Sequence, residues 1–448
     1  MAETEHFDTL IVGAGAAGLA AAAELGKQRG TVCLLEARDR VGGRMFTRRE
    51  SGIALPIELG AEFIHGRSPA TLGWLAKSNS AIVDSAGERW TLCDGKPEPS
   101  NNLFEQMKHG LQNIQRPRKD LPFSEFLDTV ARRKLSPAAR KLARALVEGF
   151  DAADATRVST WATLDEWSGN SSADSPTFRP LGGYASLVDG LACALDPDKV
   201  QVRLNTVVHT IHWQRGQVKI EASRHGQPCS VQAKRAIITL PLGVLQLPAH
   251  SAGAVRFVPD ARKQQALTGL APGPVIKVVL HFRKPFWEEI DDGRYRDGAF
   301  FRVPGAPFPT FWSAVPLRGS LLNAWAGGPR AKSLAGRNEA ELTCAALDSL
   351  QSMFGRKVRV RGMLERAYLH DWQADPFAHG AYSYVIAGGT AARKALAAPV
   401  QNTLFFAGEA ADTQGESGTV AGALQSGTCA ARRVLDLAKG NRRPSAAL

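Results

Sequence analysis

The sequence predicts an α/β fold built on a Rossmann-type dinucleotide-binding domain, and three observations near the N-terminus predict it. The apolar stretch Phe7–Val12 is typical of a buried strand, and the alanine-rich stretch Ala16–Arg29 is typical of a helix. Between them, a Gly-x-Gly-x-x-Gly motif occupies the turn Gly13–Gly18. A second strand, Thr31–Glu36, ends in a carboxylate at the position expected for a ribose-binding acid.

Each glycine of this motif has its own structural task. Gly13 permits a tight turn, Gly15 lets the backbone approach a pyrophosphate, and Gly18 lets the helix pack closely against the strand. The first residues of the helix then point free N–H groups and a positive dipole end towards the phosphates. The unit as a whole predicts a bound dinucleotide.

The bulk composition is that of a soluble globular protein with room for two domains: 448 residues, 44% hydrophobic and 22% charged. The net charge is +12, but Lys and Arg are spread along the chain, with one local excess between Lys108 and Arg144. We interpret this stretch as a solvated face of helices, and a docking surface for an acidic partner is the alternative. Nucleic acid is not expected as a partner.

The sequence indicates neither a metal site nor a membrane-spanning segment. The six cysteines are far apart and form no Cys/His cluster, so we expect a reducing compartment and no metal site. Met1–Asp8 lacks the features of a signal peptide, and no apolar run approaches the ~20 residues that a membrane span needs. We expect a cytoplasmic protein, for which a homodimer is an open option.

Two stretches after the second strand carry unusual polar residues. In Arg40–Arg44, the pair Gly42-Gly43 suits a backbone passing close to phosphates, with Arg44 as counter-charge; an ordinary surface turn is the alternative. The second stretch, Ile57–Gly66, is apolar with polar insertions. On composition alone we interpret these insertions as solvated strand positions: Glu58, Glu62 and His65.

The remaining pattern is first mostly helical and then rich in strands. From about Thr71 to Gly169 helices are predicted, one of them capped by Ser136, opened by Pro137 and running towards Glu148. Predicted strands follow a helix that starts at Leu181–Tyr184 and runs through Leu195: Val200–Leu204, Val207–Trp213, Val218–Glu221, Ala236–Leu240, Val275–Phe282, Phe308–Val315, Ser320–Gly327 and Leu404–Glu409. The other predicted helices are Glu339–Met353 and Val420–Leu435.

One predicted strand, Val275–Phe282, has a cation on an otherwise apolar segment. Its pleat places Ile276, Val278, Leu280 and Phe282 on one face, and Lys277 on the other. On composition alone, Lys277 is expected to be exposed.

Taken together, seven stretches in order resemble the flavin-dependent amine oxidases, which include monoamine oxidases, polyamine oxidases and flavin histone demethylases. They cover nearly the whole chain: Ile11–Gly18 with Glu36, Arg40–Arg44, Glu58–Ala61 with Ile64–Gly66, Leu240–Leu245, Lys277–Phe282 with Pro285–Trp287, Asp371–Tyr384, and Leu404–Glu409 with Gly418–Val420. The polyamine oxidase and demethylase branches are nearest, through Leu240–Leu245 and Gly380–Val385.

The resemblance implies FAD as the cofactor and an interrupted fold. It implies an FAD-binding domain of residues 1–80, 180–262 and 395–448, with an inserted α+β substrate domain of residues 81–179 and 263–394. The cofactor-binding residues that it implies are Gly13, Gly15, Ala16, Ala17, Gly18, Glu36, Ala37, Arg38, Gly42, Gly43, Arg44, Gly60, Ala61, Glu62, Val207, Gly408, Glu409, Gly418, Thr419 and Val420.

The resemblance also implies a catalytic set. Lys277 matches the lysine that reaches flavin N5 through a water, which replaces the exposed interpretation. Tyr382 and Trp372 match residues that line the substrate cavity, where an aromatic wall excludes water and attracts an amine's charge. Thr419 and His65 complete this set.

Three departures separate the chain from the monoamine oxidases. Ala381 stands where their flavin-linking cysteine would be, so non-covalent FAD is expected. Thr419 replaces the second tyrosine of their aromatic cage. The third departure is that no carboxyl-terminal membrane helix is expected.

The predicted reaction is oxidation of the C–N bond of a polyamine, diamine or bulky monoamine to an imine, which hydrolyses to an aldehyde or ketone while oxygen becomes hydrogen peroxide. No general base is identifiable. Carboxylates at Glu62 and Glu416 are candidates to hold a distal ammonium, with exposure to solvent as the alternative.

Three alternatives stay open. An L-amino-acid oxidase would need an arginine clamp, which the sequence does not place. A flavin desaturase or porphyrinogen oxidase would act on C–C bonds. A non-catalytic flavin-bearing binding protein would use the Lys108–Arg144 stretch for docking.

Overall fold

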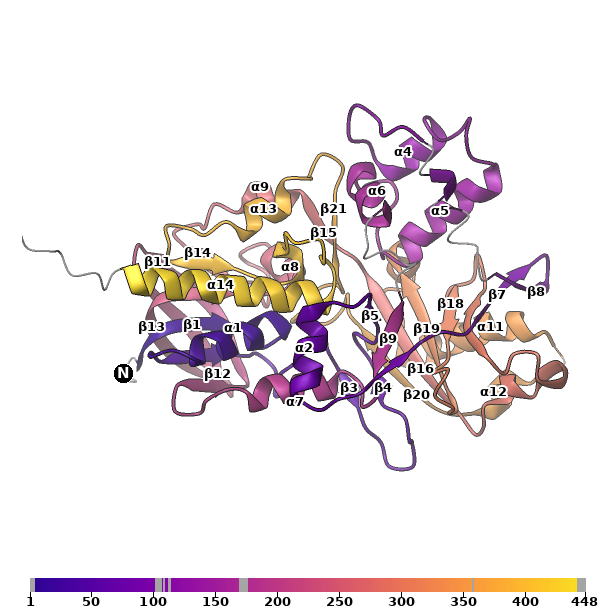
Figure 1. Ribbon diagram of the computed structural model, residues 1–448, viewed down its shortest axis with the longest axis horizontal. Coiled ribbons are helices and arrows are strands. Elements are labelled where there is room, and N and C mark those ends of the chain that lie inside the picture. Colours follow the sequence, from indigo (N-terminus) through magenta and orange to yellow (C-terminus); the bar gives the residue numbers. More distant parts are fainter. Residues whose placement is uncertain are drawn as a thin grey trace, which may run out of the picture.

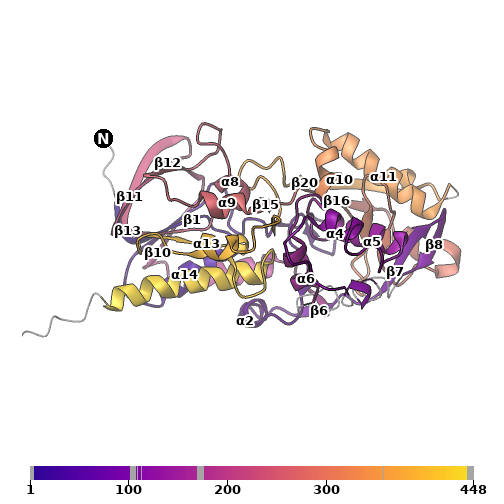
Figure 2. The same cartoon turned by 90° about the horizontal axis from the view of Figure 1, so that it is seen from above.

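The computed structural model describes residues 5–100, 107, 109–111, 114–168, 176–356 and 358–440. Two large sheets, each with helices packed on it, lie at opposite ends of an elongated molecule (Figures 1 and 2). Lys108 and Gly169, which end two of the stretches interpreted above, lie outside the described residues.

The first sheet contains the predicted dinucleotide-binding unit. Its strands run in the order β10 (Val200–Arg203), β2 (Val32–Leu35), β1 (Glu5–Val12), β13 (Gln227–Ile238), β12 (Gln217–Arg224), β11 (Thr206–Gln214) and β14 (Arg256–Val258), and β22 (Leu404–Phe406) also pairs with β13. β10, β2, β1, β13 and β22 are parallel, as the strand–turn–helix pattern predicts.

Helices cover this sheet because its central strands are apolar on both faces. Ile11, Leu34 and Ile237 pack beneath α1 (Ala16–Gly26) and α14 (Val420–Gly440), while Leu10 and Ile238 join the core on the other face. The remaining helices around this half are α2 (Pro69–Lys77), α7 (Ala185–Cys193), α8 (Leu242–Leu245), α9 (Gln264–Thr268), α13 (Ala392–Ala397) and the short 3₁₀ turn η3 (Glu409–Ala411).

The second sheet is mostly antiparallel. Its order is β20 (Leu364–Asp371), β16 (Val275–Phe282), β19 (Leu321–Gly327), β18 (Thr310–Trp312), β17 (Gly298–Arg302), β7 (Glu88–Cys93) and β8 (Lys96–Pro99). On β16 the predicted pleat is correct, because Ile276, Val278, Leu280 and Phe282 all enter one hydrophobic core. Lys277 therefore belongs to the opposite face of the sheet.

Short and longer helices cover the core face of the second sheet. They are α10 (Gly328–Ser333), α11 (Glu339–Phe354), α12 (Val360–Met363) and the 3₁₀ turns η1 (Phe286–Glu288) and η2 (Ile290–Gly293). A capping box begins α11: Asn338 accepts a hydrogen bond from the Glu341 backbone, and Glu341 accepts one from the Asn338 backbone. The opposite face is left for the site described below.

Small sheets and a helical subdomain join the two halves. The small sheets pair β3 (Thr47–Arg48) with β4 (Ile57–Glu58), β15 (Leu270–Pro272) with β21 (Ser383–Val385), and β9 (Thr177–Pro180) with both β5 (Ile64–His65) and β6 (Ile82–Asp84). The subdomain contains α4 (Phe123–Asp128), α5 (Pro137–Gly149) and α6 (Thr160–Ser168).

The expectation of mostly helices from Thr71 to Gly169 is wrong for one segment. Residues 82–99 form β6, β7 and β8 instead. β7 pairs with β17, about two hundred residues later, so the strand is stabilised by a partner that no local pattern reveals. The helix that begins after Ser136 does form, and the Ser136 hydroxyl accepts a hydrogen bond from the Ala139 N–H.

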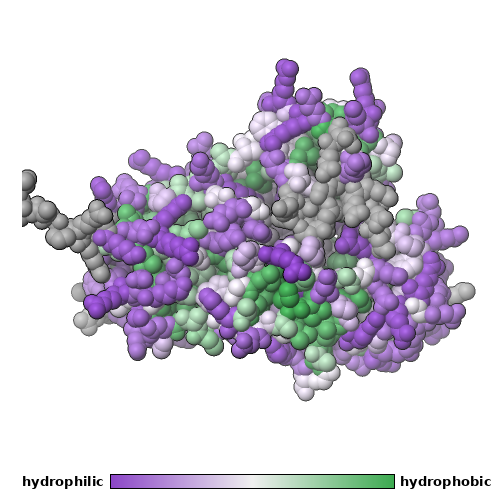
Figure 3. Space-filling model, in the orientation of Figure 1, coloured by the Kyte–Doolittle hydropathy of each residue, from purple (hydrophilic) through white to green (hydrophobic). Residues whose placement is uncertain are grey.

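The outer surface is mainly hydrophilic in the view of Figure 3, with a hydrophobic area near the middle of that face. Among the described helices, none has the length and apolar character needed to cross a membrane. The described residues also contain no group of His, Cys, Asp or Glu side chains suited to holding a metal ion.

Candidate active site

A single large cavity runs from the glycine turn of the first sheet to the open face of the second sheet. Its volume is about 1780 Å³, well above the roughly 300–1,000 Å³ of ordinary small-molecule pockets. It therefore has room for a dinucleotide and a further ligand beyond it.

The cofactor end of the cavity is a cradle of bare backbone. Gly13 adopts a φ of +101°, and a Cβ on Gly43 would approach the Gly15 Cα to 3.1 Å. The N-terminus of α1 has no side-chain cap, so its N–H groups remain available to an anion. A Cβ on Gly18 would lie 1.9 Å from the Gly13 carbonyl oxygen, which only glycine permits. These features fit the pyrophosphate of FAD.

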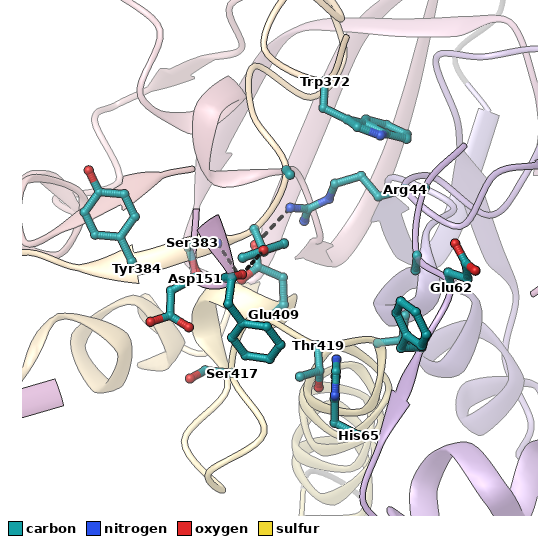
Figure 4. Close-up of a pocket in the computed structure, with 18 of the residues that line it drawn as sticks. Arg44, Glu62, His65, Asp151, Trp372, Ser383, Tyr384, Glu409, Ser417 and Thr419 are labelled. Atoms are coloured by element: carbon teal, nitrogen blue, oxygen red, sulfur yellow. Dashed lines mark hydrogen bonds and ion pairs between the residues drawn. The ribbon is translucent and has the colours of Figure 1, made fainter. Parts of the chain in front are cut away.

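Charged side chains surround this cradle. The buried Glu36 carboxylate accepts hydrogen bonds from the Ala14 N–H at 2.7 Å and the Arg38 N–H at 3.0 Å, which fixes it at the end of β2. Arg44 pairs with Glu409 at 3.1 Å, and the second oxygen of Glu409 accepts a hydrogen bond from the Ser383 hydroxyl at 2.6 Å (Figure 4). Arg44 thus links the two segments that the resemblance assigned to the cofactor.

The structure brings nearly all the predicted site residues to this cavity. Of the residues predicted to bind the cofactor, all but Gly18 line it, and Gly18 lies behind it at the helix–strand contact. The five predicted catalytic residues also line it: Lys277, Tyr382, Trp372, Thr419 and His65. Their roles toward cofactor and substrate remain predictions.

Lys277 is buried within a cluster of charged side chains, so the prediction from composition that it is exposed is wrong. Its side chain is 1% exposed and lies 2.7 Å from Glu62. The other oxygen of Glu62 accepts a hydrogen bond from Arg179 at 2.9 Å, and Trp312 donates a further one at 2.9 Å. Burial raises the pKa of Glu62, but Lys277 and Arg179 outweigh burial and hold that pKa below its ordinary value. Glu62 is therefore an ionised partner for Lys277.

The interpretation of Glu58 and Glu62 as solvated strand positions is also wrong, because both are buried. Both oxygens of Glu62 have partners, so this carboxylate is not available to hold a distal ammonium. Glu58 accepts hydrogen bonds from the Tyr184 N–H at 2.6 Å and the Thr47 hydroxyl at 2.9 Å. Burial raises the pKa of Glu58 to about 7 despite these bonds and the nearby Lys277.

Two parallel aromatic rings stand near Lys277. Tyr382 stacks on Trp325, with ring centroids 6.4 Å apart and planes 13° apart. Trp325 is directly opposite Lys277 in the β16–β19 register. The Tyr382 hydroxyl donates a hydrogen bond to the Phe150 carbonyl, which fixes the ring. Trp372 lines the same cavity and donates a hydrogen bond to the Leu59 carbonyl at 2.9 Å.

Thr419 and His65 are two smaller residues of the cavity wall. Thr419 lies immediately before α14 (Figure 4). Its hydroxyl donates a hydrogen bond to the Glu416 carbonyl at 2.6 Å and accepts one from the Gly422 N–H at 3.1 Å. Burial lowers the pKa of His65 to about 4, so its imidazole is neutral at pH 7. His65 packs edge-on against Phe150 at 5.6 Å.

An acidic pair that the sequence did not indicate faces the cavity near Tyr382. Asp151 follows α5 and Glu166 lies on α6, and both line the cavity. Burial, and then the charge of Glu166, raises the pKa of Asp151 well above its ordinary value; burial also raises the pKa of Glu166. Figure 4 shows Asp151 and Glu62 on opposite sides of the site.

Other lining residues were missed because only pairing between distant segments brings them here. Trp312 and Trp325 lie in predicted strands, where alternation gives the two faces but not which face borders a ligand. Arg179 on β9 does not line the cavity, but it holds the lining residue Glu62, which lies more than a hundred residues away in the sequence. The aromatic character of Phe308–Val315 and Ser320–Gly327 was the one available signal.

Comparison with known proteins places this site in a family. The family described as flavin containing amine oxidoreductase matches residues 16–435. Polyamine oxidase 4 of Oryza sativa subsp. japonica is 29% identical over 460 residues, covering 94% of this chain and 87% of that protein. Lysine-specific histone demethylase 1 homolog 3 of Arabidopsis thaliana is 28% identical over 502 residues. The match covers 96% of this chain but only 30% of that protein.

Solved structures support the fold. A putrescine oxidase bound to putrescine superposes with a TM-score of 0.79 at 22% identity, covering 97% of this chain and all of the other. The cyclohexylamine oxidase of Brevibacterium oxydans IH-35A gives a TM-score of 0.77 at 22% identity, covering 97% and 99% of the two chains. Because the family match spans nearly the whole chain and the glycine cradle fits its cofactor, the protein belongs to the flavin-containing amine oxidoreductases, a family of FAD-dependent amine oxidases.

Proposed function

We propose that the protein oxidises the C–N bond of an amine, a polyamine, diamine or bulky monoamine, to an imine, with oxygen reduced to hydrogen peroxide. The imine then hydrolyses to an aldehyde or ketone. The observation that carries this proposal is the continuity of one cavity, in which the glycine cradle for FAD opens onto a chamber walled by Lys277, Trp325 and Tyr382. The reacting group and the oxidant would meet in a space bounded by aromatic rings and one buried cation.

The chain's own residues suit this chemistry. FAD, when bound, supplies the two-electron acceptor. Tyr382 and Trp325 offer parallel faces that exclude water and attract a cationic amine. Lys277, held by Glu62, contributes a fixed positive charge that can orient a water. These residues bind and orient the amine and shape its electrostatic surroundings.

The acidic pair supplies the group for which the sequence offered no candidate. An amine must lose its proton before its lone pair can assist C–H cleavage. Asp151 and Glu166 border the chamber near Tyr382, where an ionised carboxylate of this pair can accept a proton from the ammonium. We infer that this pair attracts the incoming ammonium and takes up its proton.

The test is anaerobic reduction of the FAD-loaded protein by a panel of monoamines, diamines, polyamines and L-amino acids, followed by a peroxide assay in air. Bleaching of the flavin by amines, with peroxide formed in air, is the expected result. Reduction by amino acids alone would favour an L-amino-acid oxidase. A flavin that no amine or amino acid reduces would contradict the proposal and leave the desaturase and binding-protein alternatives.

A further inference from the structure

The cavity-facing side of the second sheet presents a row of side chains that leads away from Lys277. By register, Lys277 on β16 is opposite Trp325 on β19, Trp325 is opposite Thr310 on β18, and Thr310 is opposite Arg302 on β17. All four line the same cavity. The row therefore connects the reactive end of the cavity to an arginine.

Arg302 has an unusual environment. Its side chain is partly buried and faces the cavity, yet it makes no hydrogen bond or ion pair with any residue in the described part of the chain. Burial, and then the charge of Arg89, lowers the pKa of Arg302 to about 10, and no described carboxylate offsets them. It remains charged at neutral pH, and a poorly solvated charge without a partner is costly.

Arg89 adds a second cation to the same wall. It lies on β7 opposite Phe300, two pairs away from the Arg302–Thr91 pair, so the two arginines are diagonal neighbours on one face. Lys141, from the basic stretch Lys108–Arg144, lines the cavity from α5. Among the carboxylates that line the cavity, Asp94, in the turn after β7, is the nearest to Arg89 in the sequence. It does not pair with Arg302.

Three other partly buried arginines that line the cavity have partners within the chain. Arg38 pairs with Asp375, Arg44 pairs with Glu409, and Arg393 donates hydrogen bonds to the Ser383 hydroxyl and carbonyl oxygens. Arg302 differs from all three in having no such partner, which points to an anion that enters from outside the chain.

We propose that Arg302 forms a subsite for an anionic group, a carboxylate in the simplest case, at the far end of the amine substrate. This inference rests on the proposed oxidation of an amine C–N bond, and among amines it favours a long monoamine with a neutral body and a distal negative charge over a diamine or polyamine. A guanidinium offers paired N–H donors whose geometry matches a carboxylate. A polyamine would place a cation beside Arg302, and this repulsion disfavours a polyamine.

The spacing sets the length of the substrate. Three strand intervals separate Lys277 from Arg302, or about 14 Å between their backbones. An α-amino acid is too short, because its carboxylate is attached to the reacting carbon itself. A long ω-amino carboxylate can place its amine near Lys277 and Tyr382 and its carboxylate at Arg302.

The experiment compares kcat/KM of the FAD-loaded enzyme for three chains of equal length: ω-aminooctanoate, octylamine and octanediamine. We expect the amino carboxylate to exceed both others by at least about tenfold at low salt, since a charge-assisted hydrogen bond has that magnitude. In Arg302→Gln, the ratio of aminooctanoate to octylamine should fall to near one, and Arg302→Lys should retain part of it. Raising the salt concentration should also reduce the ratio in the wild type.

Arg366→Gln is the matched control, because Arg366 lies on β20 at the opposite edge of the same sheet and does not line the cavity. It should keep the wild-type ratio. Flavin absorbance and thermal unfolding identify a variant that fails to fold, and inhibition of wild type by octanoate gives a second measure of the subsite. If octylamine is oxidised as well as aminooctanoate by the wild type, the subsite is refuted while the proposed function stands. If no amine reduces the flavin, the proposed function itself fails.

Discussion

The Lys277 ammonium lies 2.7 Å from Glu62, and the same carboxylate accepts a hydrogen bond from Arg179 at 2.9 Å on its other oxygen. One anion thus holds two cations in a region where the three side chains are at most 9% exposed. Because a buried charge without its partner is strongly destabilising, the orientation of Lys277 depends on Glu62 as much as on the strand that carries it.

Glu62→Gln should therefore lower the free energy of unfolding by about 3 kcal/mol, because two buried cations lose their counter-charge. Lys277→Met in that background should recover part of the loss. Denaturant unfolding of the four proteins of this double-mutant cycle gives the coupling free energy. Additive effects of the two substitutions would mean that the ion pair has no coupling free energy and does not stabilise the fold.

Lys277→Met alone should keep the fold and FAD but slow flavin reduction, reoxidation or both, and ~1.4 kcal/mol of lost stabilisation is already tenfold in rate. Stopped-flow absorbance measures the two half-reactions. Lys263→Met is the control, because Lys263 is also buried but bonds the Ala395 carbonyl at 2.8 Å, away from the cavity. Wild-type rates in both half-reactions would remove Lys277 from the catalytic set.

FAD should be bound without a covalent link. Ala381 lines the cavity directly before Tyr382 and has no thiol to form a thioether. Acid precipitation of the yellow protein should release the flavin into the supernatant. Colour that stays in the pellet would contradict this expectation.

The glycine cradle gives a prediction with a matched control. Gly18→Ala should weaken FAD retention and lower the melting temperature, because its Cβ would lie 1.9 Å from the Gly13 carbonyl oxygen. Gly73→Ala in α2 should be neutral or stabilising, since a Cβ there meets nothing within 4 Å and alanine favours helix. Titration of apoprotein with FAD and thermal unfolding compare the two, and equal effects would count against the close-packing role.

The parts of the protein that the sequence predicted well are those specified by neighbouring residues. The strand, glycine turn, helix and Glu36 of the first unit lie within about thirty residues, and the pleat of β16 follows from alternation alone. Residue patterns of this kind also matched the capped helix after Ser136.

The features that the sequence did not predict depend on partners that lie far away in the sequence. Glu62 looked solvent-exposed because its partners Arg179 and Lys277 lie 117 and 215 residues later. β7 looked helical because its partner β17 is distant. Arg302 ends a short strand with no local feature, and only the register across four strands relates it to Lys277.

The last prediction concerns pH and the buried Glu58. Burial raises its pKa from 4.5 to about 7, so the folded state favours the protonated form more than the unfolded state does. The stability that protonation contributes is complete below pH 4.5 and is lost as the pH rises towards and through 7. Across that window the wild type should lose up to about 3 kcal/mol of unfolding free energy from this group.

Glu58→Gln should remove that loss, because an amide cannot ionise yet can still accept the Tyr184 N–H. We expect the variant to match the wild type near pH 4.5 and to be more stable at pH 8, as measured by denaturant unfolding of the FAD-loaded proteins. Glu98→Gln, at an exposed position on β8, is the control and should leave the difference between the two pH values unchanged. If Glu58→Gln is instead less stable than the wild type at pH 8, then Glu58 is ionised in the folded protein, and Lys277 rather than burial determines its charge.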